Sequence, residues 1–295
     1  MKTLNIIGAG RVGRSLAHLW HARGVFEIQD VLTRSTASAN EAIQFIGAGR
    51  AVETLKAMRT ADVWMLAVPD NQIDKVANEL SNTGADGVFI ALDAIIFQCS
   101  GALSSATLQS LKDKGSHVAS AHSILSFSAP SSAIVQFAGT PCALEGDTTA
   151  AKILKPAFEA IGAKCFDLAA ADKVLYHAAA VFATNFLPVL QVVAADLWRS
   201  TGMPQDLIAP LNVSLLRNAV QNITAQGAAQ ALTGPAARGD TAVVALQGHA
   251  VADWQTDAGQ AYQALSTLAG KIARDGFIVD TSNHKNQDKD KRTSP

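Results

Sequence analysis

The sequence of 295 residues has few cysteines and almost no net charge, and both shortages exclude classes of protein. Its three cysteines lie far apart and form neither a CxxC pair nor a cluster with metal-ligand spacing. This argues against a disulfide scaffold and a structural metal, so we expect no metal site and a reducing, cytoplasmic location. The formal net charge of −1 leaves no basic surface that would indicate nucleic-acid binding.

Targeting signals and common hydrolase motifs are also missing. Too few apolar residues precede Gly8 for a signal peptide. One apolar run, 174–198, has the length of a membrane span, but it carries a proline and polar side chains such as His177 and Asn185. Because a spanning helix of about 20 residues tolerates few such interruptions, we expect a buried helix and no membrane partner. No Ser/His/Asp arrangement, nucleophile elbow or Walker loop is visible.

The chain is long enough for two domains, and the pattern of its apolar runs changes along its length. Over roughly the first 170 residues, short apolar runs alternate with segments of helical period, which is typical of βαβ units in a mostly parallel sheet. Strands are expected at 4–7, 28–33, 62–68, 88–92 and 117–121, and a last strand–helix–strand unit at 141–168. The run 91–99 is apolar at nearly every position, so the end of its strand stays open.

After about residue 170 the strand pattern stops, and long helices rich in Ala, Leu and Val are expected up to residue 275. The polar C-terminal end lacks the apolar residues of a core and is expected to be disordered. The sequence therefore predicts an α/β fold with an N-terminal Rossmann-type parallel sheet and an all-helical C-terminal domain. The expected boundaries are 1–168 for the sheet domain, 169–280 for the helical domain and 281–295 for the tail.

The motif GAGRVG follows the first predicted strand and opens the first predicted helix. Gly8 permits a sharp turn, Gly10 lets the backbone approach a pyrophosphate, and Gly13 lets helix and strand pack tightly. The helix N-terminus, with Arg11 and Val12, offers N–H groups and a partial positive charge to an anion. Because the motif stands in a series of βαβ units, it predicts a dinucleotide-binding site.

The residues after the second strand favour NADP over NAD. An NAD site usually has a carboxylate at this strand end, whereas this chain has Thr33, Arg34 and Ser35. A guanidinium and hydroxyl groups suit a 2′-phosphate. Two alternatives stay open: Asp30 reaches the ribose if the strand is shorter, and Arg11 either flanks the same phosphate or is solvated.

Later strand ends supply further candidates, because loops at the carboxyl ends of parallel strands line the ligand crevice. Val68 and Pro69 close one strand, and Asp70 is interpreted as a helix cap. Ser100 follows the next strand, where its hydroxyl suits close approach to nicotinamide or substrate. His122 follows another strand and either transfers a proton or merely satisfies a loop carbonyl.

The first long helix of the C-terminal half carries Lys173, Tyr176, His177 and Asn185. His177 and Asn185 are separated by about 80° around a helix, so both can face one groove. Polar groups on an apolar helix are costly unless they are satisfied, so these residues bond within the core or face a ligand.

The stretch LTGPAARGD interrupts the helices further along. Asp240 is expected to cap the next helix. Arg238 either binds a substrate carboxylate or phosphate, or pairs with Asp240.

Several of these stretches together resemble one bacterial family: GAGRVG, AVPD, CSGAL, AHSILSF, YHAAAVFATNF and LTGPAARGD. Its members are uncharacterised Rossmann-like NADP-dependent oxidoreductases with a C-terminal helical domain of unknown function. More distantly, the arrangement resembles pyrroline-5-carboxylate reductase and the 6-phosphogluconate and 3-hydroxyacid dehydrogenases. The family has His-Pro where this chain has His122-Ser123.

The resemblance implies that the helical domain forms a homodimer and closes the active site against the nicotinamide. The 3-hydroxyacid dehydrogenases use a lysine and an asparagine of the first long helix, for which the nearest matches here are Lys173, His177 and Asn185. The resemblance also implies that the following residues line the site: Tyr176, His177, Asn185, Arg238 and Asp240.

These observations predict an NADP-dependent oxidoreductase, with NAD the less favoured cofactor. Hydride would pass between nicotinamide and a small C=O or C=N substrate in a cleft between the domains. His122 or His177 would move the proton. Asn185 and Ser100 would orient the reacting group, and Arg238 would hold an anionic substrate. The alternatives are a non-catalytic NADP(H)-binding sensor or regulatory protein, and a protein that binds a different nucleotide at the glycine loop.

Overall fold

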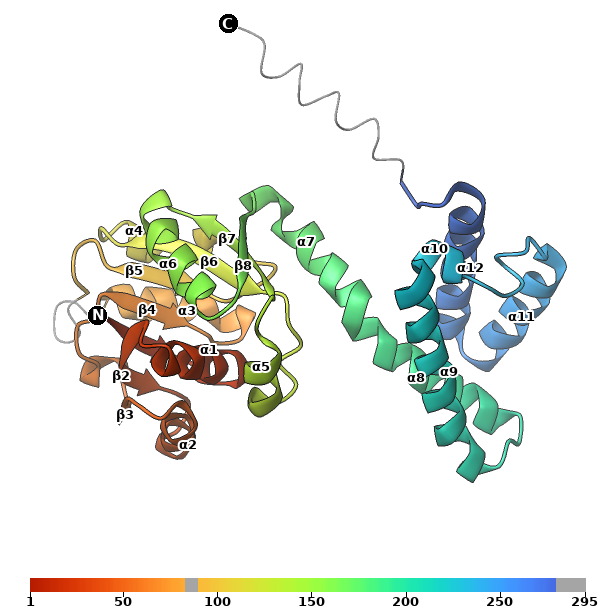
Figure 1. Cartoon of the computed structure of the whole chain (residues 1–295), viewed down its shortest axis with the longest axis horizontal. Helices are drawn as coiled ribbons and strands as arrows, with labels where there is room; N and C mark the ends of the chain where they lie inside the picture. Colours follow the sequence, from red (N-terminus) through yellow and green to blue (C-terminus); the bar gives the residue numbers. More distant parts are fainter. Residues whose placement is uncertain (83–89, 280–295) are drawn as a thin grey trace, which may run out of the picture. The chain divides into compact units, whose positions relative to one another are not determined.

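The computed structural model describes residues 1–82 and 90–279, and the chain divides into two compact units. The first unit runs from Met1 to Phe186 and the second from Leu187 to Pro295. The whole sheet belongs to the first unit, whose last strand ends at Asp167 (Figure 1). The predicted tail 281–295 lies outside the described residues.

The first unit is built around one sheet of eight strands in the order β3-β2-β1-β4-β5-β6-β7-β8. β6 and β7 pair antiparallel, and the other neighbouring strands pair in parallel. This sheet confirms the predicted Rossmann-type architecture, because the order from β3 to β6 is that of a dinucleotide-binding sheet. The strands are β1 (Lys2–Ile7), β2 (Phe26–Leu32), β3 (Arg50–Val52), β4 (Val63–Leu66), β5 (Ile95–Gln98), β6 (His117–Ser123), β7 (Pro141–Gly146) and β8 (Lys164–Asp167).

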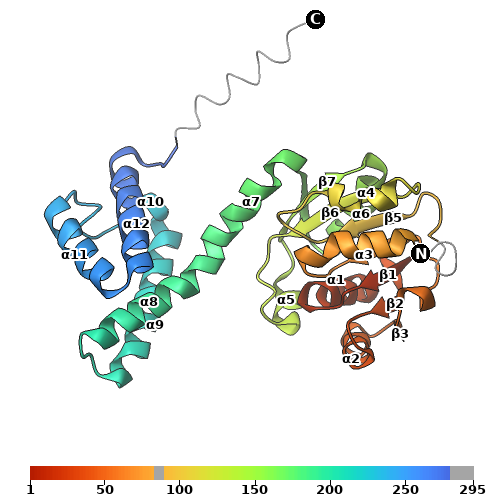
Figure 2. The same ribbon diagram turned by 180° about the vertical axis from the view of Figure 1, so that it is seen from behind.

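Helices cover both faces of the sheet, which explains why β4 is apolar at every position. Val63 and Met65 pack in the same core as α1, α2 and α6, whereas Trp64 and Leu66 pack with α3 and α4. Figures 1 and 2 show the sheet from its two sides. The helices of this unit are α1 (Arg11–Ala22), α2 (Thr36–Ile46), α3 (Asp70–Asn82), α4 (Gln109–Lys112), α5 (Pro130–Gln136), α6 (Thr148–Ala160) and α7 (Lys173–Ala180). Shorter helical turns lie at Leu55–Ala57, Ser105–Leu108 and Ala170–Asp172.

Trp20 fixes α1 against the sheet. Its side chain is fully buried and meets the rings of Phe26, Phe97 and Phe158 edge-on, with ring centroids 5.1–6.2 Å apart. Its indole N–H donates to the carbonyl oxygen of Ala157 at 2.9 Å. Edge-to-face aromatic pairs each add about 0.5–1.5 kcal/mol beyond the burial of their area. The N-terminus of α1, where the glycine motif lies, is therefore held in a fixed place.

The strand predicted at 88–92 is wrong in position within the described residues, because β5 begins at Ile95. Residues 88 and 89 lie outside the described part of the chain. Asp93 adopts a left-handed φ of 65°, and its backbone N–H donates to the carbonyl oxygen of Gly115 at 3.1 Å. Apolar residues on both sides of Asp93 hid this turn, since apolar character alone does not distinguish a strand from the segment that leads into it.

The second unit is helical, which confirms the predicted all-helical C-terminal region. Asn212 donates to the carbonyl oxygen of Gln191 at 3.0 Å and links α9 to α8. The indole N–H of Trp254 donates to the Ser200 hydroxyl at 3.0 Å and links α11 to α8. The helices are α8 (Phe186–Ser200), α9 (Gln205–Gln226), α10 (Ala228–Ala231), α11 (Thr241–Trp254) and α12 (Thr256–Asp275).

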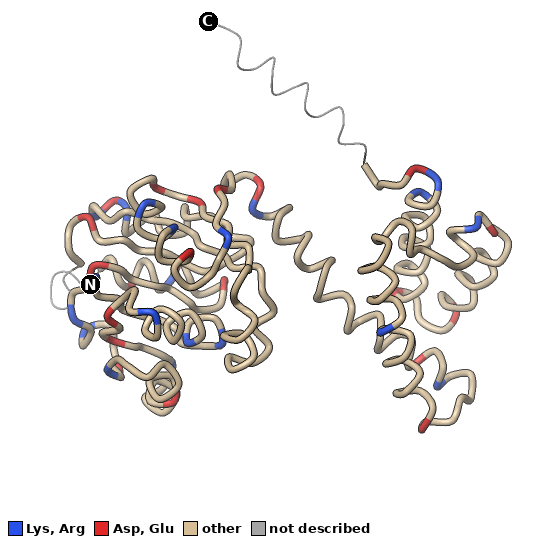
Figure 3. Tube along the Cα trace, viewed as in Figure 1, with Lys and Arg blue, Asp and Glu red and all other residues tan. Residues whose placement is uncertain are grey.

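The apolar run 174–198 is helical as predicted, but its expected burial is wrong. It comprises α7, a π-helical turn at Val181–Asn185 and α8. No Lys, Arg, Asp or Glu stands between Lys173 and Asp196, so this part of the tube in Figure 3 has no charged colour. By length and composition alone, Ala170–Ser200 is long and apolar enough to cross a membrane, and its most apolar window has no buried residue. The sequence pattern predicted the helix but could not show that many of its apolar side chains stay exposed.

Candidate active site

The glycine motif forms the turn between β1 and α1. Gly8 has a φ of +88°, and a Cβ there would lie 2.6 Å from the carbonyl oxygen of Ala67 and 2.8 Å from a methyl of Val68. A Cβ on Gly13 would lie 2.4 Å from the carbonyl oxygen of Gly8. At Gly10, in contrast, a Cβ would meet nothing within 4 Å. Packing therefore requires the outer two glycines, and Gly10 borders open space at the start of α1, as the approach of a pyrophosphate demands.

Asp30 is buried in an ion-pair cluster, which argues against the alternative that its carboxylate binds the ribose of NAD. Its carboxylate is fully buried and pairs with Arg50 at 2.9 Å and Arg59 at 2.8 Å. Burial alone would raise the pKa of Asp30, but the hydrogen bonds from Arg59 and Arg50 outweigh it and hold that pKa below its ordinary value. β2 also continues to Leu32, beyond the point at which Asp30 could stand at its tip.

The residues after β2 offer an exposed cation beside the start of α2. The Ser35 hydroxyl caps α2 by accepting from the backbone N–H of Ser38 at 3.2 Å. The Thr33 hydroxyl donates to the carbonyl oxygen of Ser35 at 2.8 Å. Arg34 is exposed and has no hydrogen bond or ion pair within the described residues. Its guanidinium is therefore available to a phosphate, whereas Thr33 and Ser35 already shape the turn.

A cavity of about 470 Å³ lies at the carboxyl ends of β5 and β6, within the first unit. Val68 and Pro69, which join β4 to α3, do not line it, although Val68 touches the glycine turn. Four residues proposed for catalysis come together here from three separate parts of the chain. The sequence-predicted residues that line the cavity are Arg11, Val12, Ser100, His122, His177 and Asn185.

Ser100 is held by its own loop rather than left free. Its hydroxyl donates to the carboxylate of Asp70 at 2.8 Å and accepts from the backbone N–H of Leu103 at 2.9 Å and of Ala102 at 3.2 Å. Its backbone N–H donates to the side-chain oxygen of Gln98. The Ser100 proton is therefore directed toward Asp70, which at the start of α3 acts as an anchor for this loop.

Two histidines converge on Gly101. The rings of His122, on β6, and His177, on α7, lie edge to face with centroids 5.4 Å apart. A Cβ on Gly101 would lie 2.3 Å from Nδ1 of His177 and 2.9 Å from Nε2 of His122. Nδ1 of His177 is buried without a hydrogen-bond partner in the described chain. Tyr176 does not line the cavity; its hydroxyl lies 2.8 Å from Nδ1 of His122, behind that ring.

Two titratable side chains that line the cavity, His122 and Cys99, are neutral near neutral pH. Burial first, and then repulsion from the neighbouring His177 and Lys173, lowers the pKa of His122 to about 4, so this imidazole is uncharged near neutral pH. Burial likewise raises the pKa of the Cys99 thiol to about 12, which excludes a thiolate nucleophile there.

Lys173 is fully buried beside these residues, with 1% of its surface exposed. Its ammonium donates to the Ser120 hydroxyl at 2.8 Å and to the carbonyl oxygen of Ser100 at 3.1 Å. Burial lowers the pKa of Lys173. The lysine thus ties α7 to the ends of β5 and β6 and places His177 one helical turn further along.

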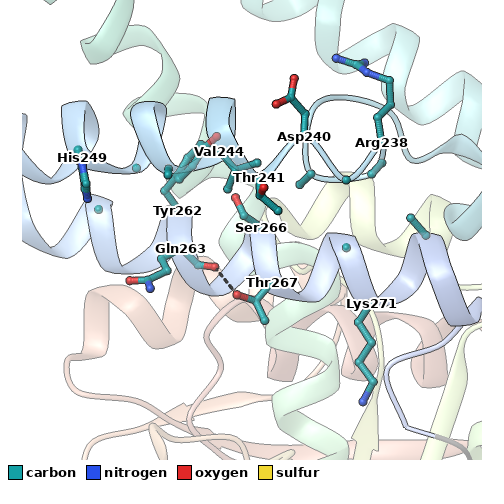
Figure 4. A pocket seen from close by; sticks show the side chains of 18 of the residues that line it. Arg238, Asp240, Thr241, Val244, His249, Tyr262, Gln263, Ser266, Thr267 and Lys271 are labelled. Carbon is teal, nitrogen blue, oxygen red and sulfur yellow. Dashed lines mark hydrogen bonds between the residues drawn. The ribbon is translucent and has the colours of Figure 1, made fainter.

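Arg238 and Asp240 lie in the second unit. They line a cavity of about 980 Å³ formed by α11, α12 and the turn that precedes α11 (Figure 4). Asp240 caps α11 by accepting from the backbone N–H of Val243 at 3.2 Å. Arg238 is exposed and forms no ion pair with Asp240 in the described residues, and Lys271 points away from both. They belong to the second unit, so their place in the predicted active site stays a prediction.

Sequence reasoning missed several residues of the first cavity. Gly101 was passed over as a small neighbour of Ser100, and Asp70 was interpreted only as a cap. Ser123 also lines the cavity. Lys173 was named from the sequence, but it does not line the cavity and instead lies buried against Ser120 and Ser100.

The Rossmann-type sheet and the glycine turn are typical of dinucleotide-dependent oxidoreductases, and a comparison with protein families finds the same class. Residues 3–94 match the family of NADP oxidoreductases described as coenzyme F420-dependent, and residues 140–269 match a domain of unknown function, DUF2520. The first match confirms the predicted class of NAD(P)-dependent oxidoreductase and the predicted cofactor NADP. The second confirms the predicted C-terminal domain of unknown function.

Solved structures show the same fold over nearly the whole chain. A protein of Bacteroides fragilis described as an NADP oxidoreductase is 22% identical, with a TM-score of 0.72 and 92% of this chain and 98% of that one covered. Protein TM1727 of Thermotoga maritima is 27% identical, with a TM-score of 0.69 and the same coverage. An imine reductase of Myxococcus stipitatus in complex with NADP+ is 16% identical, with a TM-score of 0.58 and coverages of 93% and 95%. No curated protein sequence matches the chain.

Proposed function

We propose that the cavity at the ends of β5 and β6 is the catalytic site of an NADP-dependent enzyme that reduces or forms a C=O or C=N bond of a small molecule. One observation carries this proposal. Ser100, His122, His177 and Asn185 are distant in the sequence, yet they line one cavity together with Arg11 of the glycine turn. NADP supplies hydride chemistry when bound, while the chain supplies binding, orientation and a proton.

The chain's own residues fit this cofactor. Gly10 borders open space at the N-terminus of α1, where unpaired N–H groups suit a pyrophosphate. Arg34 is an unpaired guanidinium at the end of β2, where a 2′-phosphate is recognised. Thr33 and Ser35 shape the turn that presents Arg34, and Val68 touches the glycine turn.

The two histidines take different roles in this proposal. Nδ1 of His177 is buried, faces the cavity side of Gly101 and has no partner in the described residues, so His177 is the group that passes the proton. His122 is neutral and binds the reacting group by a hydrogen bond. Asn185 orients the substrate with its amide, and Ser100 holds the loop beneath it.

Arg238 and Asp240 remain predictions from the family resemblance for binding an anionic substrate. Their support here is that they share one cavity of the second unit.

Titration of the protein with NADPH and NADH, followed by intrinsic fluorescence, tests the cofactor site. The Arg34→Ala variant should bind NADPH about 10–100-fold more weakly, because a charge-assisted hydrogen bond contributes about 1.5–3 kcal/mol. Its affinity for NADH should stay unchanged. Arg23→Ala, at the opposite end of α1, is the matched control and should bind both nucleotides like the wild type. Equal losses for NADPH and NADH in Arg34→Ala would contradict a phosphate-binding role.

NADPH oxidation with small keto acids, aldehydes and cyclic imines tests the reaction itself. Turnover with any of these would identify the acceptor. Tight NADPH binding with no turnover in any of them would instead favour the alternative function, a sensor of NADP(H).

We also propose that the chain is a cytoplasmic homodimer whose helices from α7 to α9 form the contact. Large apolar side chains stand exposed along these helices, among them Val174, Phe182, Val192 and Leu207. A second copy that covers them would remove this surface from water at a gain of about 25 cal/mol per Å². The free thiols of Cys99, Cys142 and Cys165 agree with a reducing compartment.

A further inference from the structure

The hydroxyl of Tyr176 contacts one ring nitrogen of His122, and this contact bears on which of the two nitrogens carries the hydrogen. The phenol oxygen lies 2.8 Å from Nδ1 of His122, and the two rings pack edge to face with centroids 5.5 Å apart. A neutral imidazole has one N–H and one bare nitrogen, and the partner of one nitrogen decides the state of the other.

The geometry favours donation by the tyrosine. Tyr176 has one hydroxyl proton and two acceptors within reach: Nδ1 of His122 at 2.8 Å and the carbonyl oxygen of His122 at 3.5 Å. The shorter contact has the usual length of a strong hydrogen bond, whereas 3.5 Å is at its limit. Burial also raises the pKa of Tyr176, so the hydroxyl keeps its proton.

With Nδ1 occupied as an acceptor, the single hydrogen of His122 must sit on Nε2. This nitrogen faces the cavity, since it lies 2.9 Å from the place that a Cβ of Gly101 would take. It has no hydrogen-bond partner among the described residues. A neutral imidazole N–H that points into a cavity can polarise a carbonyl or imine by a hydrogen bond without giving up its proton.

We propose that Tyr176 is a positioning residue whose hydroxyl donates to Nδ1 of His122 and so fixes the tautomer in which the Nε2–H group faces the cavity. This inference rests on the proposed function, because it names the donor to the C=O or C=N group of that same site. Tyr176 itself does not touch the substrate. His177 then remains to pass the proton, and the two histidines do not compete for one role.

Nitrogen NMR of protein labelled with ¹⁵N-histidine tests this directly, without any substrate. The His122 signals are identified by their loss in His122→Asn. In the wild type near neutral pH we expect a protonated Nε2 and a bare Nδ1. In Tyr176→Phe, which keeps the ring but removes the hydroxyl, we expect the single tautomer to be lost.

The chain offers a matched control, since Tyr262 is its other tyrosine and bonds Gln247 in the second unit at 2.6 Å. Tyr262→Phe should leave the His122 signals unchanged. A wild-type spectrum with the proton on Nδ1, or His122 signals that are the same in Tyr176→Phe and wild type, would overturn the proposal. NADPH titration of the same samples keeps the two proposals distinguishable: absent binding in the wild type defeats the proposed function, whatever the tautomer.

Discussion

The two units of the chain treat their apolar side chains in opposite ways. In the first unit Trp20 and Trp64 are completely buried, whereas Trp254 in the second unit is 37% exposed. Within residues 187–279, Ile208 is the only large apolar side chain that is buried. The first unit therefore has a complete core of its own, and the second presents a surface of the kind that another protein covers.

This difference in burial also determines how firmly the polar side chains of each unit are held. A closed core fixes polar atoms, and Lys173, Ser100 and Asp70 accordingly all have hydrogen-bond partners at 2.8–3.1 Å. In the second unit Arg238 is held by nothing comparable. The catalytic proposal accordingly rests on the first unit, and the proposal about assembly rests on the exposed helices.

The largest expected effect concerns two histidines that line cavities in different units, His177 in the first and His249 in the second. His177→Ala should lower kcat about 100-fold or more, because a positioned proton donor or acceptor contributes about 10²–10⁴-fold. NADPH affinity should be retained. His249→Ala, in the cavity of the second unit, is the control and should turn over like the wild type. Both variants are assayed by NADPH oxidation. Loss of turnover in His249→Ala but not in His177→Ala would place the catalytic site in the second unit.

Removal of one tryptophan from each unit tests the contrast in burial. Trp20→Ala should lower the free energy of unfolding by about 3–5 kcal/mol, because it empties a closed aromatic core. Trp254→Ala should cost about 1 kcal/mol, since it removes a half-exposed ring and one hydrogen bond. Urea unfolding followed by circular dichroism measures both. Losses of equal size would show that the second unit has a core of the same quality.

The stability of the first unit should fall in acid, because its His122 is a buried neutral imidazole. Its pKa is lowered from 6.5 to about 4, so the unfolded chain binds a proton more readily than the folded one. The stability that this difference contributes is present above pH 6.5 and is lost as the pH falls from 6.5 to about 4. It amounts to about 3 kcal/mol at about 1.4 kcal/mol per pKa unit.

Unfolding in urea at about pH 7 and about pH 4 measures this contribution. His122→Asn should lose about 3 kcal/mol less than the wild type between these two values. The idea of a buried neutral His122 fails if wild type and variant lose the same stability.

A substitution on α8 is expected to have the smallest effect on stability, although it should change the assembly of the chain. Val192→Glu places a charge on a 60% exposed apolar position and should convert a dimer into a monomer in sedimentation equilibrium, with an unchanged melting temperature. Val135→Glu, on α5 of the first unit and 81% exposed, is the control and should not change the mass. A wild-type monomer that binds lipid vesicles would favour a membrane surface over a second copy.

Much of the first unit could be predicted from local pattern alone. The spacing of Gly8, Gly10 and Gly13 directly after a strand determined the turn, because φ values and close contacts demand glycine there. Ser100 and His122 were found by their position after predicted strands, since parallel strands end at one edge. The cofactor preference followed from Arg34 and from the lack of a carboxylate beside it.

What the sequence could not show depends on side-chain direction and on partners. Lys173 and Tyr176 are adjacent to His177 on one helix, but only the structure shows that one reaches Ser120 and the other Nδ1 of His122. Asp30 looked able to meet a ribose until its two arginine partners, Arg50 and Arg59, were seen. The exposure of 174–198 was missed because periodicity reports an apolar face, not what covers it.

The arrangement around Asp30 has a consequence for the history of this chain. Its carboxylate is committed to joining β2, β3 and the segment after Ala57, so it contributes to stability and not to coenzyme choice. In the function proposed above, coenzyme choice falls instead to Arg34, which faces solvent and has no partner in the described structure. On that proposal, one substitution at the surface changes the dinucleotide preference at almost no structural cost, whereas loss of the Asp30 carboxylate leaves two arginines without their shared partner.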